Sequence, residues 1–387
     1  MPELTVRTAG ESHGPAVLAL VEGFPAGVPV DTGRIDADLA RRQGGYGRGG
    51  RQRIEADRVE ILAGVRGGRT LPGPVVLLVR NRDVRLEEAP AVTRPRPGHA
   101  DLAGALKYLD PDVRNVLERA SARETAGRVA AGGLVKGLLA EFGIEVIAWV
   151  YRLGGVMANS PALGEVPSDL AAVRRRRDES EVYCPDAEAS EAMKEAIDQA
   201  RDAGDTLGGM IQCVAEGVPP GLGGHTQWTR KLDGRLARAV MSVQAIKGVE
   251  IGLGFRGADL RGSQVHDAIA FDETQRAGPS AGFVRPTNRA GGLEGGMTNG
   301  APLVLRAAMK PISTLKKPLA SVDLATRESA EAAYERSDVC ALPAASVVVE
   351  AVVATELAAA MVERFGGDSL RQMRAAWDAW HREAGDL

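Results

Sequence analysis

Aromatic residues are scarce in this sequence of 387 residues, because Phe, Trp and Tyr together supply only 4% of it. Hydrophobic residues nevertheless reach 44%, so a core has to be built from Ala, Val, Leu and Ile. Cysteine is also rare, and the three cysteines lie far apart with no C-x-x-C pair. This spacing argues against a disulfide scaffold and against a zinc site, and we predict no bound metal.

Signals for membranes and nucleic acids are missing as well. The sequence does not open with a basic segment followed by a long apolar run, and no stretch approaches 18 apolar residues. We therefore expect neither a secretory signal nor a transmembrane helix, and we predict a cytoplasmic protein without a membrane partner. The formal net charge of -3 gives no global attraction to nucleic acid. Any site for a polyanion therefore requires a local concentration of Arg.

Periodicity and end signals predict the main elements of secondary structure. Strands are expected at 4–8, 16–21, 74–79, 144–150 and 209–214, and helices at 31–42, 121–142, 190–203, 232–246, 344–365 and 369–383. The best helix begins with Ser121 and Glu124, which fit the S-x-x-E capping box, and ends at Gly143. Asp31 is a candidate N-cap for the first helix. The arginines of 174–177 are expected to form a solvated charge run.

No linker divides the sequence, which favours one domain over residues 1–387. Gly67–Thr70 followed by Pro74–Leu77 has a counterpart with equal spacing in Gly295–Thr298 followed by Pro302–Leu305. Each copy leads to a long Ala-rich helix that ends in Phe-Gly. We therefore predict two pseudo-equivalent halves.

Two of the five histidines lie on glycine-containing loops. His13 belongs to Gly-Glu-Ser-His-Gly, and His99 belongs to Arg-Pro-Gly-His-Ala-Asp. Reacting groups concentrate on such loops, and histidine exchanges protons near neutral pH. Both residues are candidate catalytic groups, although a hydrogen-bonded loop histidine is the simpler alternative.

Arginine and glycine alternate between Arg41 and Arg53. Arginine is preferred where carboxylate or phosphate is bound in a planar, bidentate manner, and glycine allows the backbone to approach such an anion closely. The G-x-G-x-x-G match within this loop is rejected as a dinucleotide motif, because it follows a helix and opens none. RNA binding fits poorly, since Tyr46 is the single aromatic residue of the loop. A small polyanion fits better.

Two further segments carry features of an anion site. Arg119 and Arg123 stand at the start of the helix with the capping box, where cations are unfavourable and a ligand would explain them. The glycine-rich segment Gly291–Gly300 needs another surface against its backbone, such as a planar ring, a phosphate or a neighbouring subunit. Lys310, Ser313 and Thr314 follow it and supply donors for phosphate.

Taken together, these segments resemble the chorismate synthase family over nearly the whole chain. The resemblance rests on Gly10–Gly14, Gly44–Arg48, Arg96–Asp101, Arg119–Gly132, Cys184–Asp186, Gln244–Glu250, Asn288–Lys310 and Arg336–Asp338. It implies an α+β fold of helices sandwiched between antiparallel sheets, assembled as a homotetramer. It also implies an anti-1,4-elimination of phosphate from 5-enolpyruvylshikimate 3-phosphate, which yields chorismate in the shikimate pathway. The reaction requires reduced FMN without net redox change, and NADPH is a source of reducing equivalents.

The resemblance also implies roles for individual residues. His13 would protonate the leaving phosphate, Ser12 would hold that histidine or the phosphate, and His99 would control protonation of the flavin. Asp338, with Ser121 near the flavin, would help to take the ring proton. The residues implied in binding substrate or NADPH are Arg42, Arg48, Arg123 and Arg336. Those implied in binding FMN are Arg119, Ala120, Ser121, Gln244, Ala245, Gly295, Lys310, Pro311, Ile312, Ser313, Thr314 and Arg336.

Two alternatives remain at this point. The first is another flavin-dependent phosphate-lyase that acts on a different carboxylated phosphate. The second is a non-catalytic anion- or RNA-binding protein that uses the Arg/Gly loop. The third motif of the family often carries His where this sequence has Ser337, which leaves no third histidine to assign.

Overall fold

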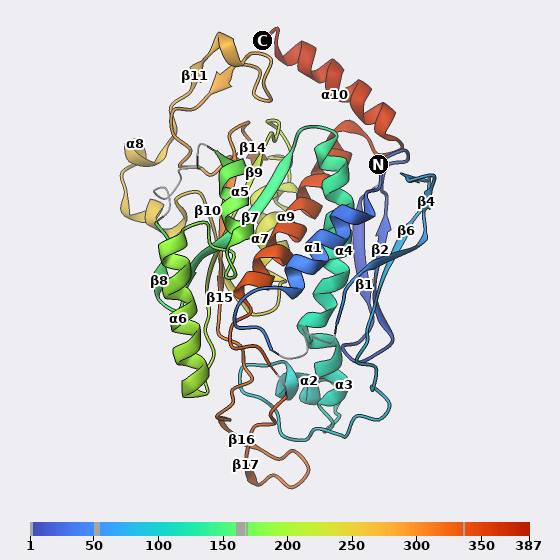
Figure 1. Cartoon of the computed structure of the whole chain (residues 1–387). Coiled ribbons are helices and arrows are strands. Elements are labelled where there is room, and N and C mark those ends of the chain that lie inside the picture. Colours follow the sequence, from blue (N-terminus) through green and yellow to red (C-terminus); the bar gives the residue numbers. More distant parts are fainter. Residues whose placement is uncertain (1–2, 50–54, 160–166, 168, 336) are drawn as a thin grey trace.

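The structure is a computed structural model that describes residues 3–49, 55–159, 167, 169–335 and 337–387 (Figure 1). The helices are α1 (Thr32–Gln43), α2 (Asp101–Tyr108), α3 (Arg114–Ala120), α4 (Thr125–Ala140), α5 (Leu170–Glu179), α6 (Ala187–Ala203), α7 (Leu232–Met241), α8 (Gly262–Val265), α9 (Leu342–Phe365) and α10 (Leu370–Ala384). The longer strands are β1 (Thr5–Ala9), β2 (Ala16–Glu22), β3 (Val59–Ala63), β6 (Val75–Arg80), β7 (Glu145–Leu153), β9 (Gly209–Glu216), β10 (Ile246–Ile251) and β15 (Leu303–Met309). The short strands are β4 (Val65–Arg66), β5 (Arg69–Thr70), β8 (Val156–Met157), β11 (Ala270–Phe271), β12 (Phe283–Val284), β13 (Leu293–Glu294), β14 (Met297–Thr298), β16 (Ala320–Val322) and β17 (Ser329–Glu331).

Two antiparallel sheets organise the described chain. The first has the strand order β1-β2-β6-β3, and the second has the order β10-β15-β9-β7-β8. Strands β1, β2, β6, β7 and β9 match the predicted segments to within a few residues, whereas β10 begins where the helix expected at 232–246 was to end, and β15 was not predicted. Helices and antiparallel strands in one chain confirm the α+β class.

Three helices occupy the middle of the molecule in Figure 1. Helix α4 contacts β1, β2 and β6, whereas α9 contacts β7 and β9, and the two helices pack against each other. Helix α1 lies against both of them. At the α4–α9 crossing a Cβ atom on Gly132 would lie 2.4 Å from the Cβ of Ala351, so only glycine permits this close approach.

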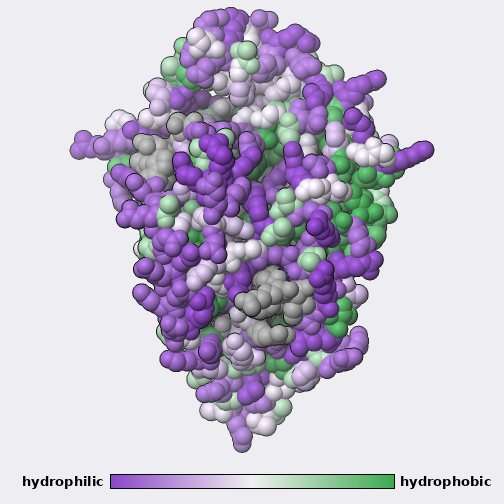
Figure 2. Space-filling view, in the orientation of Figure 1, coloured by the Kyte–Doolittle hydropathy of each residue, from purple (hydrophilic) through white to green (hydrophobic). Residues whose placement is uncertain are grey.

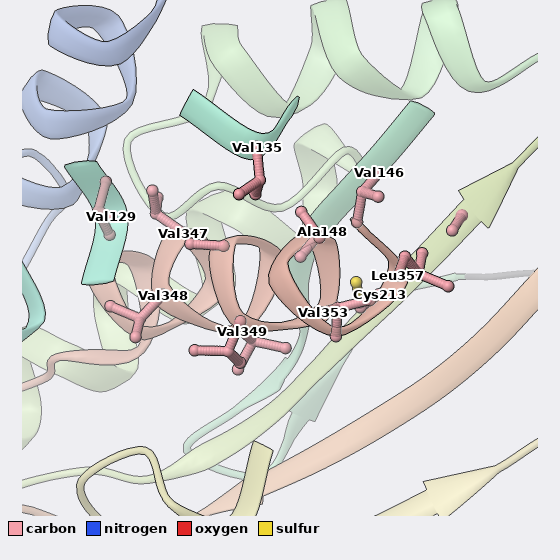
Figure 3. Packing of buried hydrophobic residues seen from close by; sticks show 14 of the residues in the cluster. Val129, Val135, Val146, Ala148, Cys213, Val347, Val348, Val349, Val353 and Leu357 are labelled. Atoms are coloured by element: carbon pink, nitrogen blue, oxygen red, sulfur yellow. The ribbon is translucent and has the colours of Figure 1, made fainter. Parts of the chain in front are cut away.

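Small aliphatic side chains fill the core, as the scarcity of aromatic residues requires. Figure 3 shows Val129 and Val135 of α4, Ala148 of β7 and Val347 to Val349 of α9 in this buried cluster. The same buried cluster extends from Leu4 to Met373. This continuity supports the predicted single domain, which stays a prediction.

Helix α9 corrects one expectation. With 24 residues it is long and apolar enough to cross a membrane, and the sequence was expected to contain no such segment. Glu350, Glu356 and Glu363 interrupt the apolar run, so the sequence contains no unbroken apolar stretch of that length although the helix is apolar on average. Since 89% of its most apolar window is buried inside the described protein, α9 is a core helix.

The two sheets share one strand order. The strands β1, β2, β3 and β6 occupy the same relative places in the first sheet as β7, β9, β10 and β15 in the second. Helices α4 and α9 each follow the last strand of their set. This agreement supports the prediction of two pseudo-equivalent halves.

Candidate active site

A cavity of 720 Å³ lies where loops from both halves of the chain meet the first turns of α9. Most of the predicted site residues line it: Ser12, His13, Arg42, Arg48, His99, Ala120, Ser121, Arg123, Gln244, Ala245, Lys310, Ile312, Ser313, Thr314 and Asp338. They come from segments up to about 325 positions apart in the sequence, so the fold alone brings them together. Among the described lining residues, Arg and Lys outnumber Asp and Glu, which favours an anionic ligand.

His13 is buried in the turn between β1 and β2. Its Nδ1 lies 2.8 Å from the Glu118 carboxylate of α3, and its backbone N–H donates to the same carboxylate at 2.9 Å. Beside it, the hydroxyl groups of Ser12 and Ser121 form a hydrogen bond of 3.1 Å. Burial raises the pKa of Glu118, but hydrogen bonds from His13 and Arg114 more than offset this, and the pKa lies below its ordinary value.

His99 has a different carboxylate partner. Its Nδ1 forms a hydrogen bond with Asp101 at the start of α2, and its side chain is 20% exposed. The guanidinium of Arg96 donates to the same carboxylate at 2.8 Å. Burial raises the pKa of Asp101, but these hydrogen bonds from His99 and Arg96 dominate and hold the pKa far below its usual range.

Arg42 and Arg123 share one buried carboxylate. Arg42 Nη2 lies 2.5 Å from Asp57, and Arg123 Nη1 lies 2.7 Å from it. Arg123 also donates to the side-chain oxygen of Asn81 at 2.6 Å. Burial lowers the pKa of Arg42. The charge of Asp57 raises it, but the neighbouring Arg123 lowers it again, and the pKa stays below its ordinary value. Glu55, a second buried carboxylate of the cavity lining, lies 3.8 Å from Arg123, so the two guanidinium groups face two carboxylates.

Arg48 joins the two halves of the chain across the cavity. Its Nη1 lies 2.5 Å from Asp338, whose other oxygen accepts the backbone N–H of Gly49 at 2.6 Å. Both side chains line the cavity, and both are mostly buried. The predicted base Asp338 is therefore held by a predicted substrate-binding arginine.

Gly45 and Gly47 of the Arg/Gly loop pack against the protein itself, contrary to the expectation that they approach a ligand, whereas Gly49 lines the cavity. A Cβ on Gly45 would lie 2.6 Å from Pro343, and one on Gly47 would lie 3.2 Å from Cys340, both next to or within α9. Arg41 also points inward, to Glu350 of α9. Arg51 and Arg53 lie outside the described residues.

The predicted capping box is absent, and α4 begins at Thr125, after a 3-10 turn at Ala122–Glu124. Ser121 accepts the N–H of Arg123 across this turn. The carboxylate of Glu124 binds Thr8, Arg128 and Gln244 instead of the backbone. Tertiary partners therefore outcompete the local cap.

Lys310 and Ser313 form another part of the cavity wall. Lys310 Nζ donates to Ser313 Oγ at 2.8 Å, and Ser313 donates to the backbone oxygen of Gly98 beside His99. Burial, and after it the charge of Lys247, lowers the pKa of Lys310. A bound phosphate would stabilise the charged form of Lys310.

Some predicted residues lie outside this cavity. Arg119 donates to the backbone oxygens of Thr8 and Gly10, which explains it without a ligand. Gly295 lies in the exposed turn between β13 and β14, and Pro311 is not part of the lining. Arg336 lies outside the described residues.

Sequence reasoning missed the residues that orient the histidines. Glu118 carries no motif that separates it from ordinary charged residues, and neither does Asp57, which holds Arg42 and Arg123. Arg96 and Asp101 belong to a quoted motif, but no role was predicted for them. Arg114 adds a further contact, because it lies 3.3 Å from Glu118. Only the short spacing of Arg96, His99 and Asp101 could have suggested such a group.

The prediction of a solvated charge run at 174–177 was wrong in part, since Arg177 is buried against Glu350.

The cavity has the size and the unpaired polar atoms expected of a site for a polar ligand. Its volume lies in the range of cofactor sites. In the described part of the chain, Gln244 Oε1 and the Nε atoms of Arg42 and Arg48 are buried without a hydrogen-bond partner. Ala245 has a φ of 66°, a strained conformation that is typical of binding sites. These polar atoms and this strained backbone are what a bound polar ligand would satisfy.

The chain is similar to known proteins over nearly its whole length. The family model described as chorismate synthase matches residues 4–362. The chorismate synthase of Desulforudis audaxviator is 59% identical over 378 residues, which covers 95% of this chain and 94% of that protein. The enzyme of Geobacter sulfurreducens is 55% identical over 386 residues, with coverage of 96% and 97%. A crystal structure of chorismate synthase matches with a TM-score of 0.81 at 40% identity, covering 100% of this chain and 99% of that one. This chain therefore belongs to the chorismate synthase family of enzymes.

Proposed function

We propose that this protein eliminates phosphate from 5-enolpyruvylshikimate 3-phosphate to form chorismate in the shikimate pathway. The observation that carries the proposal is the cationic cavity that gathers His13, His99 and Asp338 in a member of this family. Its substrate has a phosphate and two carboxylates, which a wall of arginines can bind. Arg42, Arg48 and Arg123 bind these groups, together with Arg336.

His13 acts as the acid for the departing phosphate. Glu118 holds its Nδ1, so that Nε2 is the ring atom able to face the ligand. Ser12 lies beside it in the same turn and orients either the imidazole or the phosphate. Protonation at the leaving oxygen lowers the barrier because the phosphate departs with less negative charge.

Reduced FMN, when bound, supplies electron density to the substrate as phosphate leaves and recovers it as the ring proton departs. We assign its binding to Ala120, Ser121, Gln244, Ala245 and Lys310–Thr314. The buried and unsatisfied Gln244 Oε1 supports this assignment, because a ring N–H would complete its hydrogen bonding.

His99 and Asp338 handle protons on the flavin side of the cavity. The Asp101 carboxylate orients the His99 imidazole. The Ser313 hydroxyl donates to the backbone oxygen of Gly98, the residue before His99. Asp338 also lines the cavity and is held by Arg48 and Gly49. A carboxylate with these donors keeps a fixed orientation, which a proton acceptor requires.

Anaerobic incubation with the substrate and chemically reduced FMN tests this function. We expect equal amounts of phosphate and chorismate without net oxidation of the flavin. Another phosphate-lyase would act on a different substrate and leave this one intact. An RNA-binding protein would instead saturate with RNA at physiological salt.

The proposal also covers the layers of sheets and helices in the fold and the assembly of several copies of the chain. We propose a β-α-β sandwich of two pseudo-equivalent halves, which the shared strand order supports. The half-buried pairs Leu18–Leu78 and Leu20–Val76 stand on the uncovered face of the first sheet. Figure 2 shows hydrophobic residues gathered at the right of the molecule, where Figure 1 draws β1, β2 and β6. Such a face supports assembly into a homotetramer.

NADPH is proposed as a source of reducing equivalents near Arg42 and Arg48. Mixing the protein with oxidised FMN and NADPH under anaerobic conditions tests this step. Consumption of NADPH identifies an internal flavin reductase activity, whereas no consumption assigns reduction of the flavin to another protein.

A further inference from the structure

The segment that follows β6 wraps around the His13 turn. The backbone N–H groups of Arg85 and Leu86 both donate to the backbone oxygen of His13, at 3.1 and 3.2 Å. Asn81 secures the same turn by donating to the backbone oxygen of Gly14 at 2.6 Å. The backbone of Arg85 is therefore fixed beside His13, whichever way its side chain points.

The Arg85 side chain contacts Nε2 of His13, the ring atom that is proposed to protonate the leaving phosphate. Its Nη2 lies 3.3 Å from His13 Nε2, and its Nε lies 3.2 Å from Asp83. A guanidinium has donors and no acceptor, so Nε2 must accept in this hydrogen bond. The proton of the ring then sits on Nδ1 and is donated to Glu118. In this arrangement His13 has no proton to give from Nε2.

Arg85 differs from the other arginines of the cavity. The side chains of Arg42, Arg48, Arg96 and Arg123 are 5%, 10%, 8% and 5% exposed, and each lies within 2.8 Å of a carboxylate. The Arg85 side chain is 44% exposed, and its nearest carboxylate contact is longer. Of the cavity arginines described, Arg85 is thus the one that can change direction without breaking a buried ion pair.

We infer that Arg85 binds the phosphate of the ligand and, in its absence, caps Nε2 of His13. A guanidinium binds phosphate through two charge-assisted hydrogen bonds, which are stronger than one hydrogen bond to a neutral ring. When phosphate arrives, Arg85 turns to it and Nε2 becomes free to take a proton. Substrate binding thereby prepares the acid that the proposed function requires, and this inference rests on that function.

The other charged groups around His13 fit this exchange. Glu118 faces Nδ1 from α3, with Arg114 behind it. Asp83 lies 3.7 Å from Nε2 and 3.2 Å from Arg85, so it is placed to hold the guanidinium in the capping position. Once Arg85 has moved, the carboxylates of Glu118 and Asp83 face the two ring nitrogens.

The test is ¹⁵N NMR of protein labelled at its five histidines, with the His13 signals assigned from a His13→Gln variant. In the ligand-free protein we expect a protonated Nδ1 and a bare Nε2. Addition of inorganic phosphate is expected to shift the Nε2 signal towards the protonated position. In Arg85→Ala the ligand-free Nε2 signal changes, and phosphate has a smaller effect.

Kinetics supply a second readout. Arg85→Ala is expected to raise the KM for substrate about 10- to 100-fold, the loss typical of a charged hydrogen bond. Arg7→Ala is the matched control, since Arg7 is 77% exposed and outside the cavity lining, and it should leave the KM unchanged.

Three results would overturn the inference: a proton on Nε2 without phosphate, a phosphate response unaltered in Arg85→Ala, or an unchanged KM in that variant. The proposed function fails separately, if the wild-type protein forms no chorismate. In that case the response of His13 to phosphate can still be measured, because it requires no turnover.

Discussion

Glu118 holds His13 at two points, through the imidazole Nδ1 at 2.8 Å and through the backbone N–H at 2.9 Å. The two residues are 105 positions apart in the sequence. The pKa of Glu118 lies below its ordinary value, because hydrogen bonds from His13 and Arg114 outweigh the effect of burial. An ionised carboxylate therefore sets the tautomer and the orientation of the ring.

We predict that Glu118→Gln lowers kcat about 10²–10⁴-fold, as in catalytic groups whose orienting carboxylate is replaced by an amide. The KM for substrate should change much less, because Glu118 does not line the cavity. Glu191→Gln, on the exposed face of α6, is the control and should keep the wild-type rate. A Glu118→Gln variant with unchanged kcat would show that the carboxylate has no part in the reaction.

His13→Ala and His99→Ala should each lose roughly 10²–10⁴-fold in turnover, the usual contribution of a proton-transfer group. Steady-state rates with reduced FMN measure this loss, and circular dichroism checks that each variant is folded. A residue whose alanine variant turns over at a near-normal rate has no place in the mechanism.

Arg48→Ala should weaken binding of substrate more than binding of FMN. Arg48 belongs to the arginine wall assigned to substrate, and its removal also leaves Asp338 without its ion-pair partner. Equilibrium titrations with each ligand alone measure the two affinities. Arg58→Ala, at an exposed ion pair with Asp36, serves as the control. Equal losses for both ligands would contradict this division between the two binding sites.

Stability should depend on Glu350, which is buried in α9 and bound by Arg41, Lys136 and Arg177. Burial raises its pKa, but these three cations prevail and hold the pKa far below its ordinary value. Glu350→Gln should lower the free energy of unfolding at neutral pH by about 3–5 kcal/mol. The three cations then face a neutral amide in place of the buried carboxylate.

The same substitution has a defined pH dependence. A lowered folded pKa stabilises the protein above the unfolded pKa, and this stabilisation is lost as the pH falls towards the folded pKa. The difference between wild type and Glu350→Gln should therefore be full at about pH 7 and smaller at about pH 4. Urea unfolding at both pH values measures it. A difference that grows towards acid pH would contradict the ion-pair account.

Local signals predicted the elements better than their partners. Asp31 accepts the N–H of Arg34 as the expected N-cap of α1, because that contact is short in sequence. Glu124 failed as a capping residue, because Thr8 and Gln244 lie near it only in the folded chain. The long-range pairing of His13 with Glu118 left no trace in the sequence, since it depends on how α3 packs beside the first turn.

The candidate site was predicted largely from the family resemblance, and the chemistry of its residues agreed with it. Glycines of the Arg/Gly loop were assigned to a ligand, yet Gly47 packs against Cys340. A glycine pattern indicates close approach without indicating what approaches. Arg85 was overlooked because it belongs to no motif, and only its distance from His13 Nε2 makes it a candidate.

The central claim is that substrate and flavin share the cavity between the two histidines. A crystal structure with 5-enolpyruvylshikimate 3-phosphate and FMN tests it most directly. We predict the isoalloxazine ring against the substrate, with the phosphate next to His13 and the flavin next to His99. Either ligand bound at a place where it contacts neither histidine would contradict the account.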